Sequence, residues 1–216
     1  MEDLKTLESC NIKRIESYLE YLPSSENPLS AMVYFIKGDK KTYIFDVGSN
    51  ELSRKIIGEV QNKVIIISHF HADHMDNMKL LNLVNTDIYL GDYSFKVLGV
   101  GTVVKDTIEI NDGVNLKIFS VQNSHAKGSL ALIINDKYLL IGDALCGNNK
   151  GFNVSLHNSL IKFLKESKYE IVLTSHDENI YTKDEIISLM ESIYKRRSKT
   201  NPYISYEMLS GMKIIG

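Results

Sequence analysis

An apolar run that opens into a cluster of histidines is the feature that most limits how this chain can fold. Val64–Ile67 reads as a buried strand, and the segment Ser68–Met78 (SHFHADHMDNM) follows it at once. Three of the six histidines in the chain fall within His69–His74, together with one carboxylate. Imidazole and carboxylate are the usual nitrogen and oxygen donors for zinc and related metals. A metal site at the end of a strand is therefore the first hypothesis.

The length of 216 residues fits one large domain or two small ones, and we expect a single domain over residues 1–216 because no repeat, low-complexity tract or linker interrupts the chain. With 44% hydrophobic and 24% charged residues, the chain resembles ordinary globular proteins. The net charge of -2 gives no reason to expect a nucleic-acid partner. Two cysteines, Cys10 and Cys146, cannot form a disulfide framework, and the N-terminus lacks the features of a secretory signal. Because no apolar stretch reaches the roughly 20 residues of a membrane helix, we expect a soluble, cytoplasmic protein without a membrane partner.

Hairpins occupy both halves of the chain, and helical patterns lie between them. Residues 4–22 fit a helix or a strand, and the tail Ile204–Ile215 has strand character. The predicted strands are Met32–Ile36, Thr42–Phe45, Val64–Ile67, Ile88–Leu90, Thr102–Ile110, Val114–Val121, Ser129–Ile134, Lys137–Ile141 and Glu170–Leu173. The predicted helices lie around Leu52–Val60, from the histidine cluster through Met78–Val84, around Leu156–Leu164 and over Lys183–Arg197.

Three more candidate ligands, His125, Asp143 and His176, also stand just beyond predicted strands. Four donors within His69–His74 cannot all reach one tetrahedral ion without strain, so two neighbouring metals follow more naturally than one. A shared Asp143 would bridge the pair. Hairpins in both halves, with helices between them, suit an α/β (α+β) fold in which two β-sheets pack face to face with helices outside.

These motifs resemble those of the metallo-β-lactamase-fold hydrolases. The segment His69–His74 (HFHADH) matches the H-x-H-x-D-H motif of that superfamily. Asn123–Leu130, Ile141–Leu145 and Thr174–His176 look like its later motifs in the right order, so the resemblance spans about residues 30 to 180. Within the superfamily the chain looks closest to the glyoxalase II-like branch, which retains the bridging aspartate where some β-lactamases carry cysteine.

The resemblance implies a four-layer αββα sandwich with two divalent metal ions in a groove at one edge of the sheets. Zinc is the ion expected, with iron or manganese as alternatives. The ligands carried over by motif fall into two sets and one shared residue. They are His69, His71 and His125 for the first metal, Asp73, His74 and His176 for the second, and Asp143 as the bridge.

The implied activity is hydrolysis of a small ester, thioester or lactone by a hydroxide held between the two metals, with Asp73 also orienting the water. A mononuclear iron oxidoreductase like the persulfide dioxygenases of the same fold is one alternative. An amide hydrolase of the β-lactam type and a non-catalytic binding protein are the others. The expected partner is a small-molecule substrate, and the sequence leaves the oligomeric state open.

Several residues near the motifs receive separate predictions. Met75–Met78 replaces the Gly-Gly pair that many relatives have after the fourth ligand. Asp46 is expected to support the ligand loop by hydrogen bonds rather than to bind metal. Lys127 is expected to be a solvated loop lysine, Cys146 a small apolar loop residue and His157 a structural histidine. Four tyrosines are considered as groove residues and mostly assigned to packing: Tyr181, Tyr194, Tyr203 and Tyr206.

Overall fold

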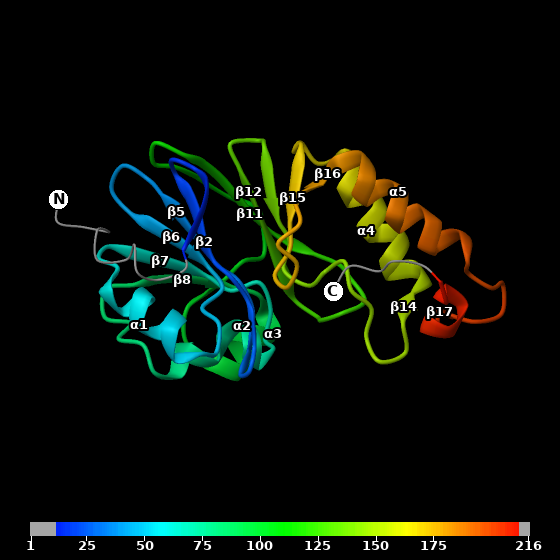
Figure 1. The fold of residues 1–216 in the computed structure, drawn as a ribbon, viewed down its shortest axis with the longest axis horizontal. Coiled ribbons are helices and arrows are strands. Elements are labelled where there is room, and N and C mark those ends of the chain that lie inside the picture. The colour runs from blue at the N-terminus through cyan, green and yellow to red at the C-terminus, as the bar shows by residue number, and fades with distance from the viewer. Residues whose placement is uncertain (1–11, 212–216) are drawn as a thin grey trace.

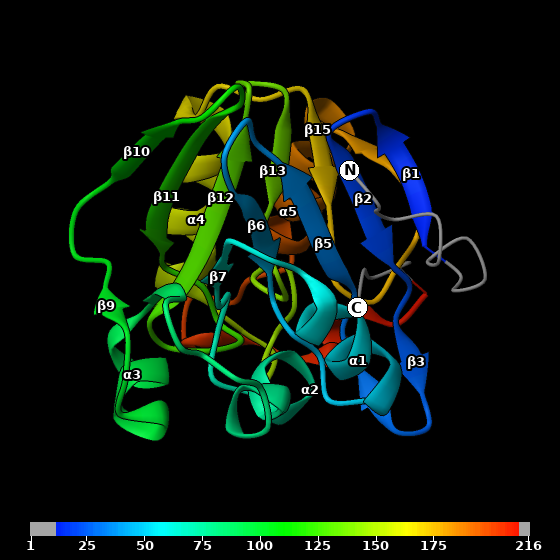
Figure 2. The ribbon, with the colours of Figure 1, turned by 90° about the vertical axis from the view of Figure 1, so that its left-hand side faces the viewer.

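Two β-sheets packed face to face form the centre of the computed structural model, which describes residues 12–211 (Figures 1 and 2). Within that range the first sheet has seven strands, in the spatial order β1 (Lys13–Glu16), β2 (Leu19–Leu22), β5 (Val33–Lys37), β6 (Thr42–Phe45), β7 (Lys63–Ile66), β8 (Asp87–Leu90) and β9 (Thr102–Val103). The strands from β6 to β9 are parallel, and the others are antiparallel.

The second sheet has six strands in the described part of the chain. Their spatial order is β10 (Ile108–Asn111), β11 (Asn115–Val121), β12 (Ser129–Ile134), β13 (Tyr138–Leu140), β15 (Ile171–Leu173) and β16 (Tyr181–Thr182). Two small pairings lie outside the large sheets: β3 (Ser25–Glu26) with β4 (Leu29–Ser30), and β14 (Phe152–Asn153) with β17 (Tyr203–Ile204).

Helices cover the outer faces of both sheets. Figure 1 shows α4 (Val154–Glu166) and α5 (Lys183–Lys195) beyond the second sheet, whereas Figure 2 shows α1 (Glu51–Glu59) in front of the first sheet. The short helices α2 (Ala72–Met75) and α3 (Asp92–Leu98) lie on the same side as α1 (Figure 2). The described part of the chain also contains two short 3-10 helices, η2 (Asp76–Lys79) and η3 (Tyr206–Leu209). The predicted αββα layering is confirmed.

Strand β12 illustrates why the layers form, because all six of its residues are buried. Side chains alternate across a strand, so Leu130, Leu132 and Ile134 join the core between the two sheets. Ala131 and Ile133 join the core beneath α4 and α5. A third core lies between the first sheet and α1. A strand that is apolar on both faces therefore requires cover on both sides.

The helix predicted to run from the histidine cluster through Met78–Val84 is wrong. The chain makes only α2 and η2 there, and Leu80 and Val84 are 64% and 75% exposed. Their apolar spacing therefore does not mark a buried helical face. The helix stops early because Asn77 directs its side-chain amide to neighbouring loop carbonyls, a competition that disfavours asparagine within helices.

Two further predictions are corrected at segment boundaries. The strand predicted over Thr102–Ile110 is divided, because β9 pairs with β8 in the first sheet and β10 pairs with β11 in the second. Exposed Lys105 and Asp106 lie between the two pieces, where the chain crosses from one sheet to the other. The tail predicted as strand contains only β17 before η3, and its last residues lie outside the described range.

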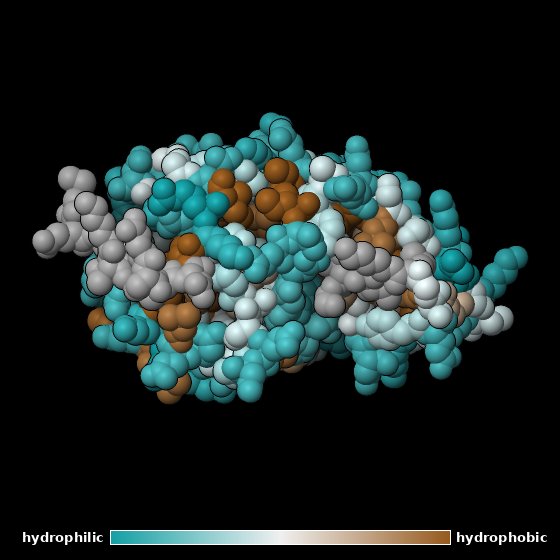
Figure 3. Space-filling view, in the orientation of Figure 1, coloured by the Kyte–Doolittle hydropathy of each residue, from teal (hydrophilic) through white to brown (hydrophobic). Residues whose placement is uncertain are grey.

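The ambiguous segment of residues 4–22 forms strands β1 and β2 in its described part, while residues 4–11 lie outside the described range. No helix among residues 12–211 is long and apolar enough to cross a membrane. On the face shown in Figure 3, hydrophilic residues surround separate apolar patches.

Candidate metal centre

The candidate ligands follow strands of both sheets. His69, His71, Asp73 and His74 follow β7 of the first sheet, whereas His125, Asp143 and His176 follow β11, β13 and β15 of the second. Backbone hydrogen bonds join the two sides at this edge. The Leu130 N–H donates to the Ser68 carbonyl at 2.7 Å, and the Met32 N–H donates to the Ser175 carbonyl at 2.8 Å. The packing of the two sheets therefore brings all seven side chains together.

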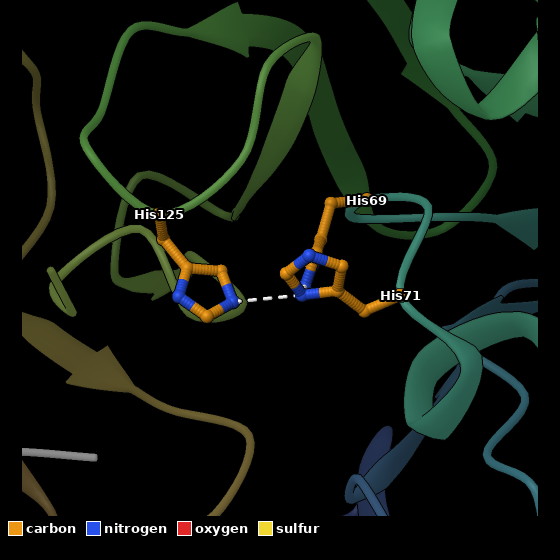
Figure 4. Close-up of side chains that lie close together, drawn as sticks. All are labelled: His69, His71 and His125. Carbon is orange, nitrogen blue, oxygen red and sulfur yellow. Dashed lines mark hydrogen bonds between the residues drawn. The ribbon is translucent and has the colours of Figure 1, made fainter. Parts of the chain in front are cut away.

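The first group consists of His69, His71 and His125, whose donor atoms lie within 4.8 Å of one another. Figure 4 shows the rings of His69 and His71, from the loop after β7, and the ring of His125, from a second loop, pointing toward one another. Nδ1 of His71 is 3.0 Å from Nε2 of His69 and 3.0 Å from Nε2 of His125. Burial, with like charge nearby, holds the pKa of His69 well below its usual value and also lowers that of His71. His69 and His71 are therefore neutral at pH 7, which is the form that binds metals.

The second group consists of Asp73, His74, Asp143 and His176, with donor atoms again within 4.8 Å of one another. Nε2 of His176 is 3.1 Å from Oδ2 of Asp73. Oδ2 of Asp143 is 3.3 Å from Nε2 of His74 and 3.4 Å from Nε2 of His125, a member of the first group. Asp143 thus lies between the two groups.

The carboxylates of the second group are ionised despite their burial. Burial alone would raise the pKa of Asp73, but hydrogen bonds from His176 and His74 hold it well below its usual value. Asp143 follows the same pattern, because the hydrogen bond from His74 outweighs burial and lowers its pKa. Two partly buried carboxylates beside the imidazole rings of His74, His125 and His176 favour the binding of positive charge at this position.

Contacts of Nδ1 in three of the histidine rings determine that Nε2 faces the other candidate ligands. Nδ1 of His69 is 3.0 Å from the Ser68 hydroxyl, Nδ1 of His74 is 2.8 Å from Oδ2 of Asp46, and Nδ1 of His125 is 3.3 Å from the Gly147 carbonyl. In each case Nε2 is left to face the cluster. Ring orientation by an outer oxygen is typical of histidines that bind metals. The donor set therefore fits divalent ions that take nitrogen and oxygen ligands.

The prediction that Asp46 supports the ligand loop is confirmed. Its fully buried carboxylate accepts hydrogen bonds from the Ser68 N–H and hydroxyl, both at 2.7 Å, and contacts His74 as described above. Asp46 has a positive φ of 59°, a conformation that aspartate tolerates better than most residues. One side chain thus joins the end of β6 to the loop after β7.

The segment Met75–Met78 differs from the corresponding motif of the family that the sequence resembles. It contains Asn77, whose hydrogen bonds support the ligand-bearing helix α2 and were not predicted from the sequence. Asn77 is 2% exposed, and its amide nitrogen lies within 3.0 Å of the Val47 carbonyl, the Asn50 carbonyl and the Ser53 hydroxyl. The carbonyl of His74 accepts from the Val47 N–H at 2.9 Å. Asn77 therefore holds α2, with its two ligands, against the turn before α1.

A cleft of about 760 Å³ opens over both ligand groups. Its described lining consists of Ser24, Ser25, Glu26, Leu29, His71, Asp73, His125, Asp143, Cys146, Gly147, His176 and Tyr206. The sequence does not predict the hairpin β3–β4 or its place in the cleft lining. Tyr206 is the one of the four tyrosines that lines this cleft.

Cys146 does more than pack within its loop, because it also borders the cleft. Burial and the nearby Asp143 raise the pKa of its thiol to about 12, so the thiol is neutral at pH 7.

Residues assigned no role in the centre do lie away from it. His157 is buried in α4, and its Nε2 is 2.8 Å from the Met190 carbonyl, as expected of a structural histidine. Lys127 is exposed and is not among the residues that line the cleft; its amino group is 5.7 Å from the centre of the Tyr93 ring.

The chain resembles known proteins in its three-dimensional fold. No protein-family model matches the sequence, and a search of curated proteins gives no match. Among solved structures, a metallo-beta-lactamase from Pontibacter korlensis matches with a TM-score of 0.67 at 13% identity, over 84% of this chain and 98% of its own. An archaeal metallo-beta-lactamase superfamily protein from Sulfolobus tokodaii matches with a TM-score of 0.63 at 16% identity, over 88% and 93% of the two chains.

The flavodiiron protein from Giardia intestinalis also matches, with a TM-score of 0.63 at 13% identity, over 86% of this chain and 59% of its own. At these sequence identities the matches show a similar fold and do not show a shared reaction. Together with the two sheets and their outer helices, they show that this chain has the metallo-β-lactamase fold.

Proposed function

We propose that this chain is a metal-dependent hydrolase with a dinuclear centre in one domain. His69, His71 and His125 would hold the first ion, Asp73, His74 and His176 the second, and Asp143 would contact both. One observation carries the proposal: seven donors from separate strand ends converge in two groups, with Oδ2 of Asp143 between them.

Two divalent cations, when bound, would polarise a substrate carbonyl and lower the pKa of water toward neutrality. The protein's own residues would orient the reactants. Asp73 is ionised and borders the cleft, so its carboxylate can accept a hydrogen bond from the attacking water. Asp46 and Gly147 keep His74 and His125 in the orientation that presents Nε2 to the centre.

The proposed substrate is a small ester, thioester or lactone. A cleft of about 760 Å³ is within the size range of small-molecule sites and opens directly onto the ligands. We also place the chain in the glyoxalase II-like branch of this fold, because Asp143 lies between the two ligand groups, where some β-lactamases carry cysteine. We further propose a cytoplasmic location.

The test combines metal content with activity. We expect two equivalents of zinc, iron or manganese per chain in the purified protein, and hydrolysis of members of an ester, thioester and lactone panel. His71→Ala and Asp143→Ala should each reduce kcat by at least about a hundredfold, as expected when an ion that stabilises charge is lost. His157→Ala is the control, because this buried histidine lies outside the centre. Unchanged hydrolysis in both ligand variants would exclude the mechanism.

Two alternatives predict different outcomes in the same assay. One iron per chain with oxygen uptake would favour a persulfide dioxygenase-like oxidoreductase, and the flavodiiron neighbour gives this outcome some weight, because its name indicates iron on the same fold. Hydrolysis confined to cyclic amides would favour an enzyme of the β-lactam type.

A further inference from the structure

One wall of the cleft is formed by the β3–β4 hairpin, which carries Glu26. Among the described lining residues, Glu26 is the charged side chain that does not belong to either ligand group. Ser25 and Leu29 are its neighbours on this wall, and Leu29 exposes 57% of its surface. A substrate that reaches the ligands therefore passes a carboxylate next to an apolar side chain.

The hairpin is held in place by hydrogen bonds to the turn before α1. The side-chain amide of Asn50 donates to the Ser25 hydroxyl at 3.0 Å, and the Ser25 hydroxyl donates to the Pro28 carbonyl at 2.7 Å. The hydroxyl of Ser49 donates to the Leu29 carbonyl at 2.5 Å. These bonds hold the hairpin backbone against the turn before α1, so the backbone of Glu26 stays beside the cleft.

The hairpin is also tied directly to the metal centre. The Ala31 N–H, just after β4, donates to the carbonyl of Asp73 at 2.9 Å. The next residue, Met32, donates to Ser175, which precedes His176. These two backbone hydrogen bonds keep the end of the hairpin next to the loops that carry Asp73 and His176, so Glu26 lies on the same side of the cleft entrance in relation to the ligands.

Neither lysine nor arginine is among the described residues that line the cleft. Cys146, Gly147 and Tyr206, which also line it, are uncharged at neutral pH. The carboxylates of Asp73 and Asp143 belong to the ligand groups, and they would offset part of the positive charge of two divalent cations. Glu26 is then the charged side chain of the described lining that the distal part of a substrate would meet outside the ligand groups.

From this distribution we propose that the cleft selects acyl substrates whose distal part is uncharged or cationic, and discriminates against distal carboxylates through Glu26. The inference rests on the proposed hydrolase function and narrows its substrate class. It disfavours acyl chains that end in a carboxylate, such as those of dicarboxylic acid half-esters and half-thioesters. The selection is electrostatic, so it weakens as salt screens the cleft.

Three para-nitrophenyl esters with the same acyl chain would test the proposal, the chain ending in trimethylammonium, methyl or carboxylate. The leaving group is constant, so only the distal charge varies. At low ionic strength we expect kcat/KM to fall from the cationic to the neutral to the anionic ester, by about three- to tenfold per step. Glu26→Gln should reduce the differences in kcat/KM among the three esters, and Glu26→Lys should reverse their order. Glu166→Gln, at the exposed end of α4, should leave it unchanged.

A binding assay separates this inference from the proposed function. Methyl ketones with the same three chains are not hydrolysed, and calorimetry of their binding should give the same order of Kd in the wild type and smaller differences in Kd in Glu26→Gln. An inactive protein that ranks the ketones in this order would overturn the hydrolase but keep the charge selection. Tightest binding of the carboxylate, or a ranking unaffected by Glu26→Gln, would overturn the selection itself.

Discussion

Asp46 links the backbone of one strand end to the orientation of one ligand. Its carboxylate holds both the Ser68 hydroxyl and Nδ1 of His74, and no solvent reaches it. An aspartate in this position does two things: it fixes the ring and raises the basicity of Nε2. Its residue type therefore matters as much as that of a ligand, although it does not face the cleft.

Asp46→Asn should weaken metal binding at the second group by about 10- to 100-fold while the fold is retained. Asparagine tolerates the positive φ of this position, so the substitution removes the charge without new backbone strain. Competition with a chromogenic chelator would measure the two affinities. Asp87→Asn is the matched control, because that carboxylate is exposed and pairs with Lys41. Equal affinities in the wild type and Asp46→Asn would contradict the supporting role.

At the scale of single elements, α2 and η2 replace the single helix that the apolar spacing of the sequence predicts. Met78 is 2% exposed and packs in the core beneath the first sheet, whereas Leu80 is 64% exposed two residues later. Met78→Ala should therefore lower the free energy of unfolding by about 2 to 4 kcal/mol. Leu80→Ala should change it by less than about 0.5 kcal/mol. Urea denaturation of both variants measures this difference. Equal losses in the free energy of unfolding would support the continuous helix that the sequence predicts instead of α2 and η2.

The ion pairs of β2 predict a specific pH dependence. The Glu20 side chain is 6% exposed and lies 2.8 Å from Nε of Arg14 and 2.8 Å from Nζ of Lys37. Burial alone would raise its pKa, but the hydrogen bonds from Lys37 and Arg14 lower it below the ordinary value of 4.5. A lowered folded-state pKa adds stability above that value, and the added stability is lost as the pH falls through the folded-state pKa.

Glu20→Gln should therefore lower the free energy of unfolding by about 1 kcal/mol at pH 7. The difference from the wild type should shrink as the pH falls well below 4.5, where both side chains are neutral. Urea denaturation at neutral and acidic pH would measure it. Glu59→Gln, at the exposed end of α1, is the control. A difference that stays constant with pH would mean that the ion pairs of Glu20 add nothing.

Local patterns predicted the elements whose signal is contained in a few residues. The strand Val64–Ile67 and the hairpin strands Ser129–Ile134 and Lys137–Ile141 were recognised because apolar β-branched runs end at polar turns. The pattern failed at Met78–Val84, where the contacts of Asn77 with a segment about 30 residues earlier decide the structure. Such contacts have no counterpart in local spacing, so the sequence alone could not reveal them.

At the scale of the whole molecule, the centre lies where the two sheets meet. The sequence predicted which side chains could bind metal, because histidine and aspartate at strand ends are conspicuous. It did not predict the cleft, because the β3–β4 hairpin and Tyr206 reach the ligands from distant parts of the chain. Substrate selection therefore depends on tertiary packing, whereas the candidate ligands can be read from four short motifs.

The ligands come from both sheets, so metal binding should stabilise the packing of one sheet on the other. Ions that bind only the folded chain add about 2.7 kcal/mol per site when their concentration is 100 times Kd. For a chain of this size we expect Tm to rise by about 5 to 10 °C per site on adding zinc, and to return to the metal-free value with a chelator. Scanning calorimetry would measure both changes.

A ligand variant distinguishes stabilisation at the centre from binding of zinc elsewhere. Asp143→Ala removes the carboxylate that lies between the two groups, so the rise in Tm should fall to less than half of the wild-type value. His157→Ala lowers the metal-free Tm by removing a buried side chain, but it should keep the full rise on adding zinc. A rise that survives in Asp143→Ala would place the stabilising ions outside the seven side chains, because no other change in that variant touches the rest of the fold.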